Sequence, residues 1–275
     1  SIEPRTIESL KAQTYRNIEI IPVNIGKERS VQVNQGAKIA KGQFFYRVDD
    51  DFILEPSVIE EAVKKCCEEG CDAVIIENAS DPSISLWAKV ITMERNCYRD
   101  DPETNFARFV KRDAFWAVGG YDEKFNAVED RDFSERLLKA NFRFGRIAPK
   151  EIHIGEPKHL RDVVRKYAYY GSSFREYLNQ HGTKSVFRLG PLRRAYVGHL
   201  QELMADPTLY LPFILYQMVR YASAMLGLLT NPPTFYAPQP CRRKLSYGSV
   251  IVARKKEDVK FEIPNSIIMD GHGSL

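Results

Sequence analysis

The sequence predicts an α/β protein with a mostly parallel sheet flanked by helices. Helical and strand patterns alternate from Thr6 to Ile76. Such alternation gives a parallel sheet that is covered on both faces and binds ligands at the carboxyl ends of its strands. Three consecutive aspartates, Asp49 to Asp51, lie at one such end. A chain of 275 residues can form one large domain or a domain with an appendage.

The elements of this alternation follow one another in order. The predicted helices cover Thr6–Gln13, Ser30–Ala40 and Ser57–Glu69, and the predicted strands cover Ile18–Val23, Phe44–Val48 and Asp72–Ile76. Pro56 is placed near the first turn of the third helix, where a missing N–H is tolerated. The strand before the aspartates is aromatic and β-branched, which favours a buried, pleated position.

The three aspartates repel one another and need a compensating positive charge. A hard divalent cation is the natural partner, because Mg²⁺ and related ions prefer carboxylate oxygens and usually keep a substrate phosphate as a ligand. In an extended chain, Asp49 and Asp51 point to one side and Asp50 to the other. From these residues alone, an acidic turn in solvent is an equally good interpretation.

Composition excludes few classes of function. The net charge of +4 gives no indication of nucleic-acid binding, and hydrophobic and charged contents of 44% and 28% are ordinary for a globular protein. Cys66, Cys67 and Cys71 fall on one predicted helix, with the last two on one face. No histidine nearby completes a zinc site, so we expect small buried thiols in a reducing compartment. With no visible signal peptide, we expect a cytoplasmic location.

Further motifs lie about eighty residues after the aspartates. They are Val118-Gly-Gly-Tyr-Asp-Glu123, and Val128-Glu-Asp-Arg-Asp-Phe-Ser-Glu-Arg-Leu-Leu-Lys-Ala140. With Asp49–Asp51, these segments resemble the family 2 glycosyltransferases, which have the GT-A fold and act with inversion. The resemblance extends from about Thr6 to about Gly171 and implies a GT-A-like domain over residues 1–171.

The resemblance implies transfer of a sugar from a UDP- or GDP-linked donor to an acceptor hydroxyl. It implies a Mn²⁺ or Mg²⁺ ion held by Asp49, Asp51 and His153, with Asp51 the more direct ligand and Asp49 near the ribose. Asp130 resembles the general base, with Glu129 supporting it. The implied substrate-binding residues are Asp49, Asp50, Gly119, Gly120, Asp122, Lys166 and Tyr170.

Each of these assignments has a plainer alternative. Glu129 and Asp130 could cap a helix, and Gly119 and Gly120 could form an ordinary turn. A lone histidine such as His153 is more often a packed or surface residue. For Lys166 and its basic, aromatic neighbours, the alternative is a solvated charged face.

The chain departs from the family pattern at three places. The family's first strand and its base-holding loop are absent, and Ser1–Arg5 is too short to supply them, although Gly248–Ala253 has the composition of such a strand. Tyr169 stands where relatives often have arginine, which leaves Lys166 or Arg165 as the substitute. Arg47 is unusual within the strand that leads to the aspartates.

The C-terminal part begins at about residue 172 and changes in character. Leu209–Leu229 is apolar and long enough to span a bilayer, but the central Arg220 argues against a span. Gln217, Arg220 and Ala224 form one helical stripe, and basic residues flank the segment on both sides. We therefore expect residues 172–232 to be helical and to lie peripherally on an anionic membrane at its cytoplasmic face.

A core helix or a homo-oligomer interface explains Leu209–Leu229 equally well. Residues 233–275 contain a Pro-rich linker followed by predicted strands at Ser246–Arg254 and Val259–Ile263. An interfacial helix would suit a lipid-linked acceptor or a cell-surface glycan.

Two other functions remain open at this point. A haloacid-dehalogenase-like phosphatase also has Asp-x-Asp after a buried strand, but here Phe52 and Ile53 follow where that family needs a small residue. The incomplete N-terminal region is compatible with a non-catalytic nucleotide-sugar-binding or scaffold protein.

Overall fold

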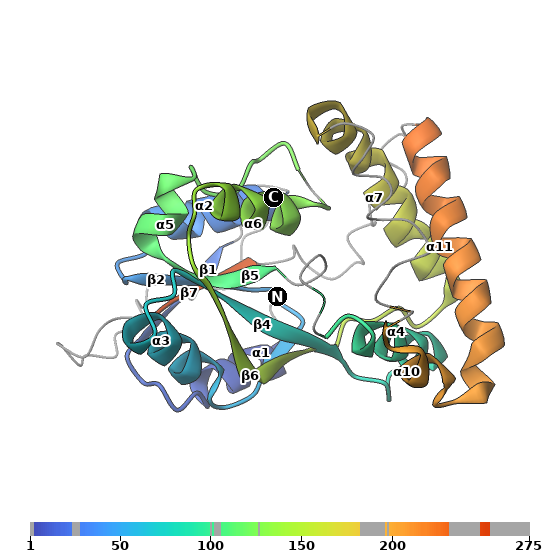
Figure 1. The fold of residues 1–275 in the computed structure, drawn as a ribbon, viewed down its shortest axis with the longest axis horizontal. Helices are drawn as coiled ribbons and strands as arrows, with labels where there is room; N and C mark the ends of the chain where they lie inside the picture. The colour runs from blue at the N-terminus through green and yellow to red at the C-terminus, as the bar shows by residue number, and fades with distance from the viewer. Residues whose placement is uncertain are drawn as a thin grey trace, which may run out of the picture.

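The computed structural model describes residues 3–23, 28–99, 101, 106–125, 127–181, 196, 198–230 and 248–253. A seven-stranded sheet has helices on both faces, and a separate helical layer stands at one end (Figure 1). The strands are β1 (Ile18–Val23), β2 (Phe44–Val48), β3 (Phe52–Leu54), β4 (Ala73–Ser80), β5 (Ala107–Lys111), β6 (Phe144–His153) and β7 (Gly248–Ala253).

The helices fall into three groups. One face of the sheet is covered by α1 (Pro4–Lys11) and α3 (Val58–Glu68), and the other by α2 (Arg29–Ile39), α5 (Arg112–Ala117) and α6 (Glu129–Lys139) (Figure 1). The helical layer contains α4 (Leu86–Asn96), α7 (Leu160–His181), α10 (Leu200–Met204), the short 3₁₀ helix η1 (Pro207–Leu209) and α11 (Tyr210–Thr230).

The sheet is less parallel than we predicted. Its strand order is β1-β7-β2-β5-β4-β6-β3, and only the β4–β6 pair is parallel. The strands β1, β2, β4 and β6 nevertheless point the same way, as strand–helix alternation requires. The strands β3, β5 and β7 run in the opposite direction. Of these, β7 lies between β1 and β2, β5 lies between β2 and β4, and β3 is at the edge next to β6.

Gly248–Ala253 does join the sheet. As β7 it lies between β1 and β2 and is antiparallel to both, for example with Ile20 and Tyr46 paired to Ile251. The described strand covers Gly248–Ala253 of the predicted Ser246–Arg254. The other residues of that prediction and the second predicted strand, Val259–Ile263, lie outside the described residues.

The central strand β2 is buried throughout, and its side chains alternate between two cores. Phe44, Tyr46 and Val48 pack toward α1 and α3. Phe45 packs on the opposite face against Phe115 of α5, with ring centroids 5.1 Å apart. Period-2 alternation places Arg47 on this second face, which α6 also covers. This placement brings a cation to the predicted site.

Two predictions about the region after β3 need correction. Helix α3 ends at Glu68, so Cys71 lies beyond it and does not share a helical face with Cys67. Cys67 is exposed, whereas Cys66 and Cys71 are buried. Pro56 precedes α3 and lies in a turn. All four cysteines within the described residues are free thiols.

The helical layer is built on the contact between α7 and α11. A Cβ atom on Gly171 would lie 2.0 Å from the carbonyl oxygen of Ala224, and one on Gly227 would lie 1.9 Å from that of Ala168. The two helices therefore approach closely where each offers a glycine to the other's backbone. The domain boundary that we predicted at residue 171 falls inside α7, which is one continuous helix.

The polar stripe of α11 points into the protein. Arg220 is 6% exposed, and its Nη1 lies 2.8 Å from both carboxylate oxygens of Glu94 on α4. We expected this stripe to belong to a helix that lies among lipid headgroups. Arg220 instead contacts Glu94 inside the protein, so the stripe is not available to headgroups. The opposite side of α11 exposes large apolar residues, including Leu211, Ile214, Met218 and Leu229. Pro207–Thr230 is long and apolar enough to cross a membrane by length and composition.

Candidate active site

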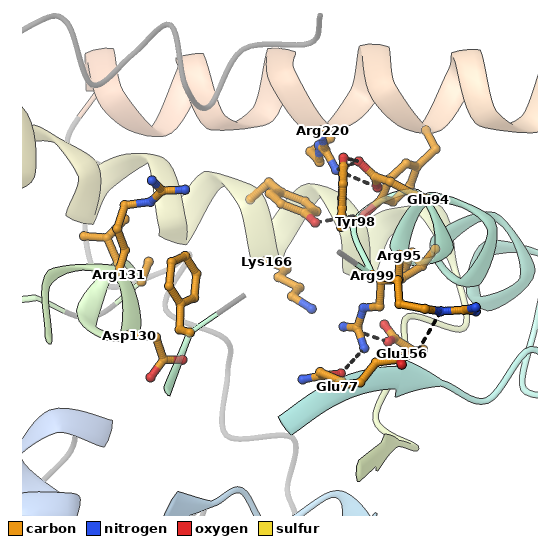
Figure 2. Close-up of a pocket in the computed structure, with 17 residues that line it drawn as sticks. Glu77, Glu94, Arg95, Tyr98, Arg99, Asp130, Arg131, Glu156, Lys166 and Arg220 are labelled. Atoms are coloured by element: carbon orange, nitrogen blue, oxygen red, sulfur yellow. Dashed lines mark hydrogen bonds and ion pairs between the residues drawn. The ribbon is translucent and has the colours of Figure 1, made fainter. Parts of the chain in front are cut away.

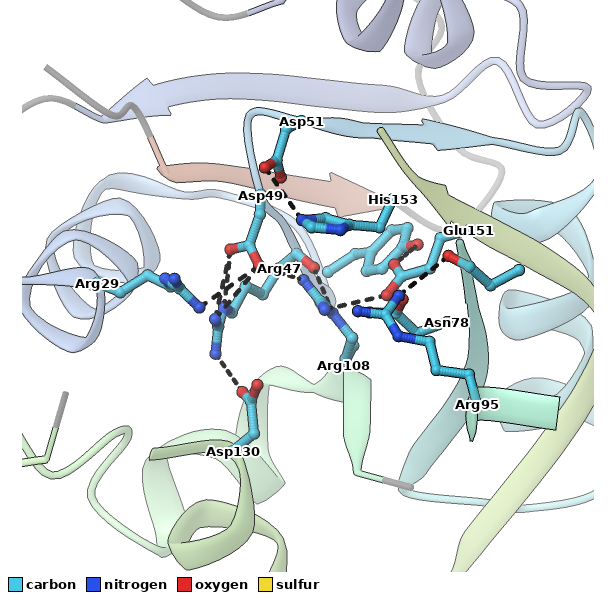
Figure 3. A network of polar contacts seen from close by, with 12 residues as sticks. Arg29, Arg47, Asp49, Asp51, Asn78, Arg95, Arg108, Asp130, Glu151 and His153 are labelled. Carbon is cyan, nitrogen blue, oxygen red and sulfur yellow. Dashed lines mark hydrogen bonds and ion pairs between the residues drawn. The ribbon is translucent and has the colours of Figure 1, made fainter. Parts of the chain in front are cut away.

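Arg47 lies at the centre of the predicted site and is 3% exposed. Its guanidinium contacts the Oδ1 atom of Asp130 through Nη1 and Asp49 through Nε at 3.3 Å (Figure 3). It also contacts the Oε1 atom of Glu129 through Nη2 at 3.3 Å. The buried cation therefore compensates acids from two elements, the end of β2 and the start of α6.

Asp49 is surrounded by arginines. Besides Arg47, the Nη2 atom of Arg108 on β5 lies 3.0 Å from Asp49 Oδ2, and Nη1 of Arg29 lies 3.8 Å from the same oxygen. Burial raises the pKa of the Asp49 carboxyl, but the three guanidinium groups outweigh burial and hold this pKa well below its usual range. Asp49 is thus an ionised carboxylate whose two oxygens face cations.

Asp51 points to a different partner. Its Oδ2 atom lies 3.1 Å from Nε2 of His153, and Nδ1 of His153 lies 2.7 Å from Oε1 of Glu156 (Figure 3 shows the first contact). Glu156 also accepts a hydrogen bond from Ser80 and pairs with Arg95. The buried Glu156 therefore orients the imidazole, so that Nε2 faces Asp51.

The turn after β2 explains why the aspartates diverge. Strand β2 ends at Val48, and Asp50 and Asp51 lie in a turn, so the extended alternation that we predicted does not continue through them. The backbone carbonyl of Asp50 accepts a hydrogen bond from Thr6 of α1. Burial, followed by the charges of Asp51 and Asp49, raises the pKa of the Asp50 carboxyl to about 6.

The contact between Asp51 and His153 has the length of a hydrogen bond, and the same separation is compatible with two neighbouring ligands of one divalent ion. Neighbouring ligands of an octahedral ion at its usual bond lengths are about 3 Å apart, and Asp51 Oδ2 and His153 Nε2 are 3.1 Å apart. In the described part of the chain, no group of three or more His, Cys, Asp or Glu side chains could hold a metal ion. Asp49, the third predicted ligand, faces arginines.

Glu129 and Asp130 begin α6, but neither is its N-cap. Val128 holds that position and makes no side-chain cap hydrogen bond. Glu129 is 3% exposed, and burial, with Asp130 next to it, raises the pKa of its carboxyl. The side chain of Asp130 is 24% exposed, and its Oδ1 atom also accepts a hydrogen bond of 3.4 Å from the Tyr121 hydroxyl. The helix-cap interpretation therefore does not account for this pair.

Gly119 and Gly120 form a turn with positive φ angles of 79° and 72°. A Cβ atom on Gly120 would lie 2.7 Å from Oδ1 of Asn34, which accepts a hydrogen bond from the Tyr121 backbone. Asp122 accepts a hydrogen bond from the backbone N–H of Lys124. These contacts support a structural role for the three predicted residues. A role in substrate binding stays a prediction.

A cavity of about 370 Å³ separates Asp130 from the helical layer (Figure 2). Its lining includes Arg95, Arg99, Arg131, Lys166 and Arg220 as cations, and Glu77, Glu94, Asp130 and Glu156 as acids. Arg95, Arg99 and Arg220 are paired with Glu156, Glu77 and Glu94.

Lys166 extends from α7 into this cavity (Figure 2). Its ammonium has no ion-pair partner among the described residues and lies 6.0 Å from the ring centroid of Tyr170. The predicted substrate residues Lys166 and Tyr170 are therefore adjacent on α7. Tyr169, by contrast, points elsewhere and donates a hydrogen bond to Glu28.

Sequence reasoning missed several residues of the site. Arg108 and Glu151 lie within ordinary strands, where no motif marks them, yet Arg108 contacts both Asp49 and the fully buried Glu151 at 3.0 Å. Burial raises the pKa of Glu151 to about 7, and Tyr46 donates a hydrogen bond to it. A charged residue inside an apolar strand is the one sequence feature that could have identified Arg108 and Glu151. The sequence analysis noted this feature only for Arg47.

Residues 25–109 match the family model of Glycosyl transferase family 2. These residues belong to glycosyl transferase family 2. The matched segment includes β2, the three aspartates and Arg108, and it confirms the resemblance inferred from the motifs. Residues 25–109 are therefore similar to part of a glycosyltransferase domain, and they lie in an α/β fold. The match ends before α6 and β6, so it does not cover Asp130 or His153.

Among curated proteins, none matches the chain in sequence. A solved structure of the mannosyltransferase PcManGT from Pyrobaculum calidifontis, in complex with GDP-Man and Mn²⁺, is similar with a TM-score of 0.44 and 13% identity, over 76% of this chain and 68% of that one. TarS from S. aureus is similar with a TM-score of 0.32 and 16% identity, over 73% of this chain and 41% of that one. This chain thus spans less than half of TarS, and likenesses this distant do not define its substrates.

Proposed function

We propose that the chain is an inverting glycosyltransferase that moves a sugar from a UDP- or GDP-linked donor to an acceptor hydroxyl. One observation carries the proposal. The guanidinium of Arg47 contacts both Asp49, within the family-matched segment, and Asp130 at the start of α6. The acid that would take the acceptor's proton and the acids of the donor side therefore belong to one site.

The residues of this site have separable roles in the proposal. Asp130 accepts the proton of the acceptor hydroxyl, whose oxygen attacks the anomeric carbon as the bond to the diphosphate breaks. The ammonium of Lys166, on the opposite wall of the cavity, attracts anionic groups that enter it. Asp51 and His153 would hold a Mn²⁺ or Mg²⁺ ion, which when bound neutralises charge on the leaving diphosphate.

The acceptor is proposed to be a glycan or a lipid-linked molecule. The cavity beside Asp130 is bounded by α7 and α11, and the outer side of α11 is apolar. The inward-facing Arg220 fixes α11 against α4, so its apolar side is held outward. We therefore propose peripheral attachment to an anionic membrane at its cytoplasmic face. Burial of the same side between two copies of the chain is the alternative.

The phosphatase and the non-catalytic binding protein, the two alternatives from the sequence, are not equally supported. The family match over the aspartates removes the reason for a haloacid-dehalogenase-like phosphatase. A non-catalytic nucleotide-sugar-binding protein has one observation in its favour, because an ion pair with Arg47 already engages the Oδ1 atom of Asp130, the residue proposed as the base.

A panel of UDP- and GDP-sugars tests the proposal. Each donor is incubated with the protein and Mn²⁺, and release of nucleoside diphosphate is measured with water and with simple glycosides as acceptors. We expect at least one donor to turn over, and Asp130→Asn to lower that turnover by about 10²–10⁴-fold. A protein that binds a donor and releases no product with any acceptor would be the non-catalytic alternative.

A further inference from the structure

Arg47 connects the two halves of the site. Within the described part of the chain, it alone contacts both Asp49 and Asp130. Its guanidinium is held from several directions, because it also pairs with Glu129 and lies 5.4 Å from the ring centroid of Tyr121. At 3% exposure the side chain has little room to move.

The two oxygens of Asp130 have different surroundings. Oδ1 accepts hydrogen bonds from Arg47 and from the Tyr121 hydroxyl. The contacts within the described residues leave Oδ2 without a donor, and Asp130 lines the cavity between α6 and the helical layer. The carboxylate is thus fixed through one oxygen and available through the other.

We propose that Arg47 is a positioning residue for Asp130, holding Oδ1 so that Oδ2 meets the acceptor hydroxyl from the cavity. The inference rests on the proposed function. In the step that follows, the acceptor proton passes to Oδ2 and the acceptor oxygen bonds to the anomeric carbon. The bond between that carbon and the diphosphate oxygen breaks, and its electron pair stays on the diphosphate.

The planar fork of arginine suits this role. Its N–H donors have a fixed geometry, so one guanidinium can address Asp49, Glu129 and Asp130 together. A general base must lie within about 2.6–3.2 Å of the hydroxyl, and a displacement of about 1 Å can cost about 10²-fold in rate. A lysine at this position would keep the positive charge but would lack the planar set of N–H donors.

A double-mutant cycle tests the inference. The substrate is the UDP- or GDP-sugar that gives the fastest turnover in the panel, at saturating concentration, and transfer is normalised to the fraction of protein that binds it. We expect Arg47→Lys and Arg47→Met each to lower kcat by about 10–100-fold. In the Asp130→Asn background, the same changes should alter the residual rate less than about twofold, because the base on which Arg47 acts is gone.

Arg108→Met is the matched control. Arg108 is also buried and paired with Asp49, but no contact with Asp130 is present, so its removal should lower the rate by a similar factor in both backgrounds. Loss of Arg47 removes a cation from Asp130, Glu129 and Asp49, of which the last two keep Arg29 as an ion-pair partner. Arg47→Lys retains the positive charge and serves as the test if Arg47→Met does not fold.

The outcomes separate the two proposals. Arg47 changes that lower the rate by the same factor with and without Asp130 overturn the positioning role and leave the proposed function intact. An Asp130→Asn variant with normal turnover overturns the proposed function itself. Failure of every donor in the panel overturns both.

Discussion

Asp130 and Asp51 are both carboxylates of the site, yet their contacts predict different losses on substitution. Asp130→Asn keeps the shape of the side chain and the contact to Arg47 but cannot take a proton. We expect kcat to fall by about 10²–10⁴-fold, with donor affinity nearly unchanged. Steady-state kinetics and donor titration check this. Asp206→Asn, at the start of η1 and away from the lining of the cavity, is the control and should retain activity within a few-fold.

Asp51→Asn should act on binding. The change weakens the pair that Asp51 forms with His153, which is where we place the metal ion. Metal-dependent donor affinity should fall by about tenfold or more, as measured by calorimetry with and without Mn²⁺, while affinity without Mn²⁺ stays the same. Identical behaviour of Asp51→Asn and Asp130→Asn would contradict the division of roles.

Site residues that lie in a recognisable sequence motif were predicted. Site residues that reach the site only through the fold were not. Asp49, Asp51, Asp130 and His153 were identified through separate segments that extend from Asp49 to His153. The arginine shell could not be predicted, because Arg29, Arg47 and Arg108 come from three elements whose meeting depends on strand order. The divergence of the aspartates also depended on where β2 ends.

At the scale of elements, the crossing of α7 and α11 makes a stability prediction. Gly227→Val places a side chain where even a Cβ atom would lie 1.9 Å from the Ala168 carbonyl oxygen. The helices must separate, at a cost of about 1–3 kcal/mol for an overpacked contact. Chemical denaturation measures the free energy of unfolding. The control is Leu229→Val on the outer side of α11, where the residue is 70% exposed and a change below about 0.5 kcal/mol is expected.

A second prediction at this scale concerns the outer side of α11. The protein should bind vesicles that contain anionic phospholipid, and salt should weaken this binding by screening. Replacement of Leu211, Met218 and Leu229 by serine should lower vesicle binding, whereas Leu138→Ser on α6, also at an exposed apolar residue, should not. A protein that stays in solution at low salt would contradict membrane attachment, and the apolar side would then be better explained as a contact between copies.

Most helices and strands were predictable from local pattern, and their arrangement was not. Strand Ile18–Val23 and strand Phe44–Val48 have the bounds that the pattern predicts. The place of β7 between them could not be derived, because the pattern of a single strand does not show which strands of the sheet it will pair with. For α11, the apolar length was visible, but the burial of Arg220 depended on Glu94, more than a hundred residues away.

At the scale of the whole molecule, the cavity between the sheet and the helical layer brings together the residues to which we assign roles. Asp130 comes from α6, Lys166 from α7 and Arg220 from α11, so the cavity exists only when the C-terminal helices pack on the transferase domain. The helical layer is therefore part of the proposed site and not a separate attachment. The part of α7 was predicted through Lys166 and Tyr170, whereas that of α11 could not be, because Arg220 is far from the other lining residues in sequence.

The central claim is that one site binds a nucleotide-diphosphate sugar together with a divalent ion. Calorimetric titration of UDP- and GDP-sugars into the full chain, with Mn²⁺ and with EDTA in its place, tests the claim most directly. We predict saturable binding of one nucleotide class with Mn²⁺, at least about tenfold weaker with EDTA. Equally tight binding with and without Mn²⁺, or no binding of any donor, would contradict the account.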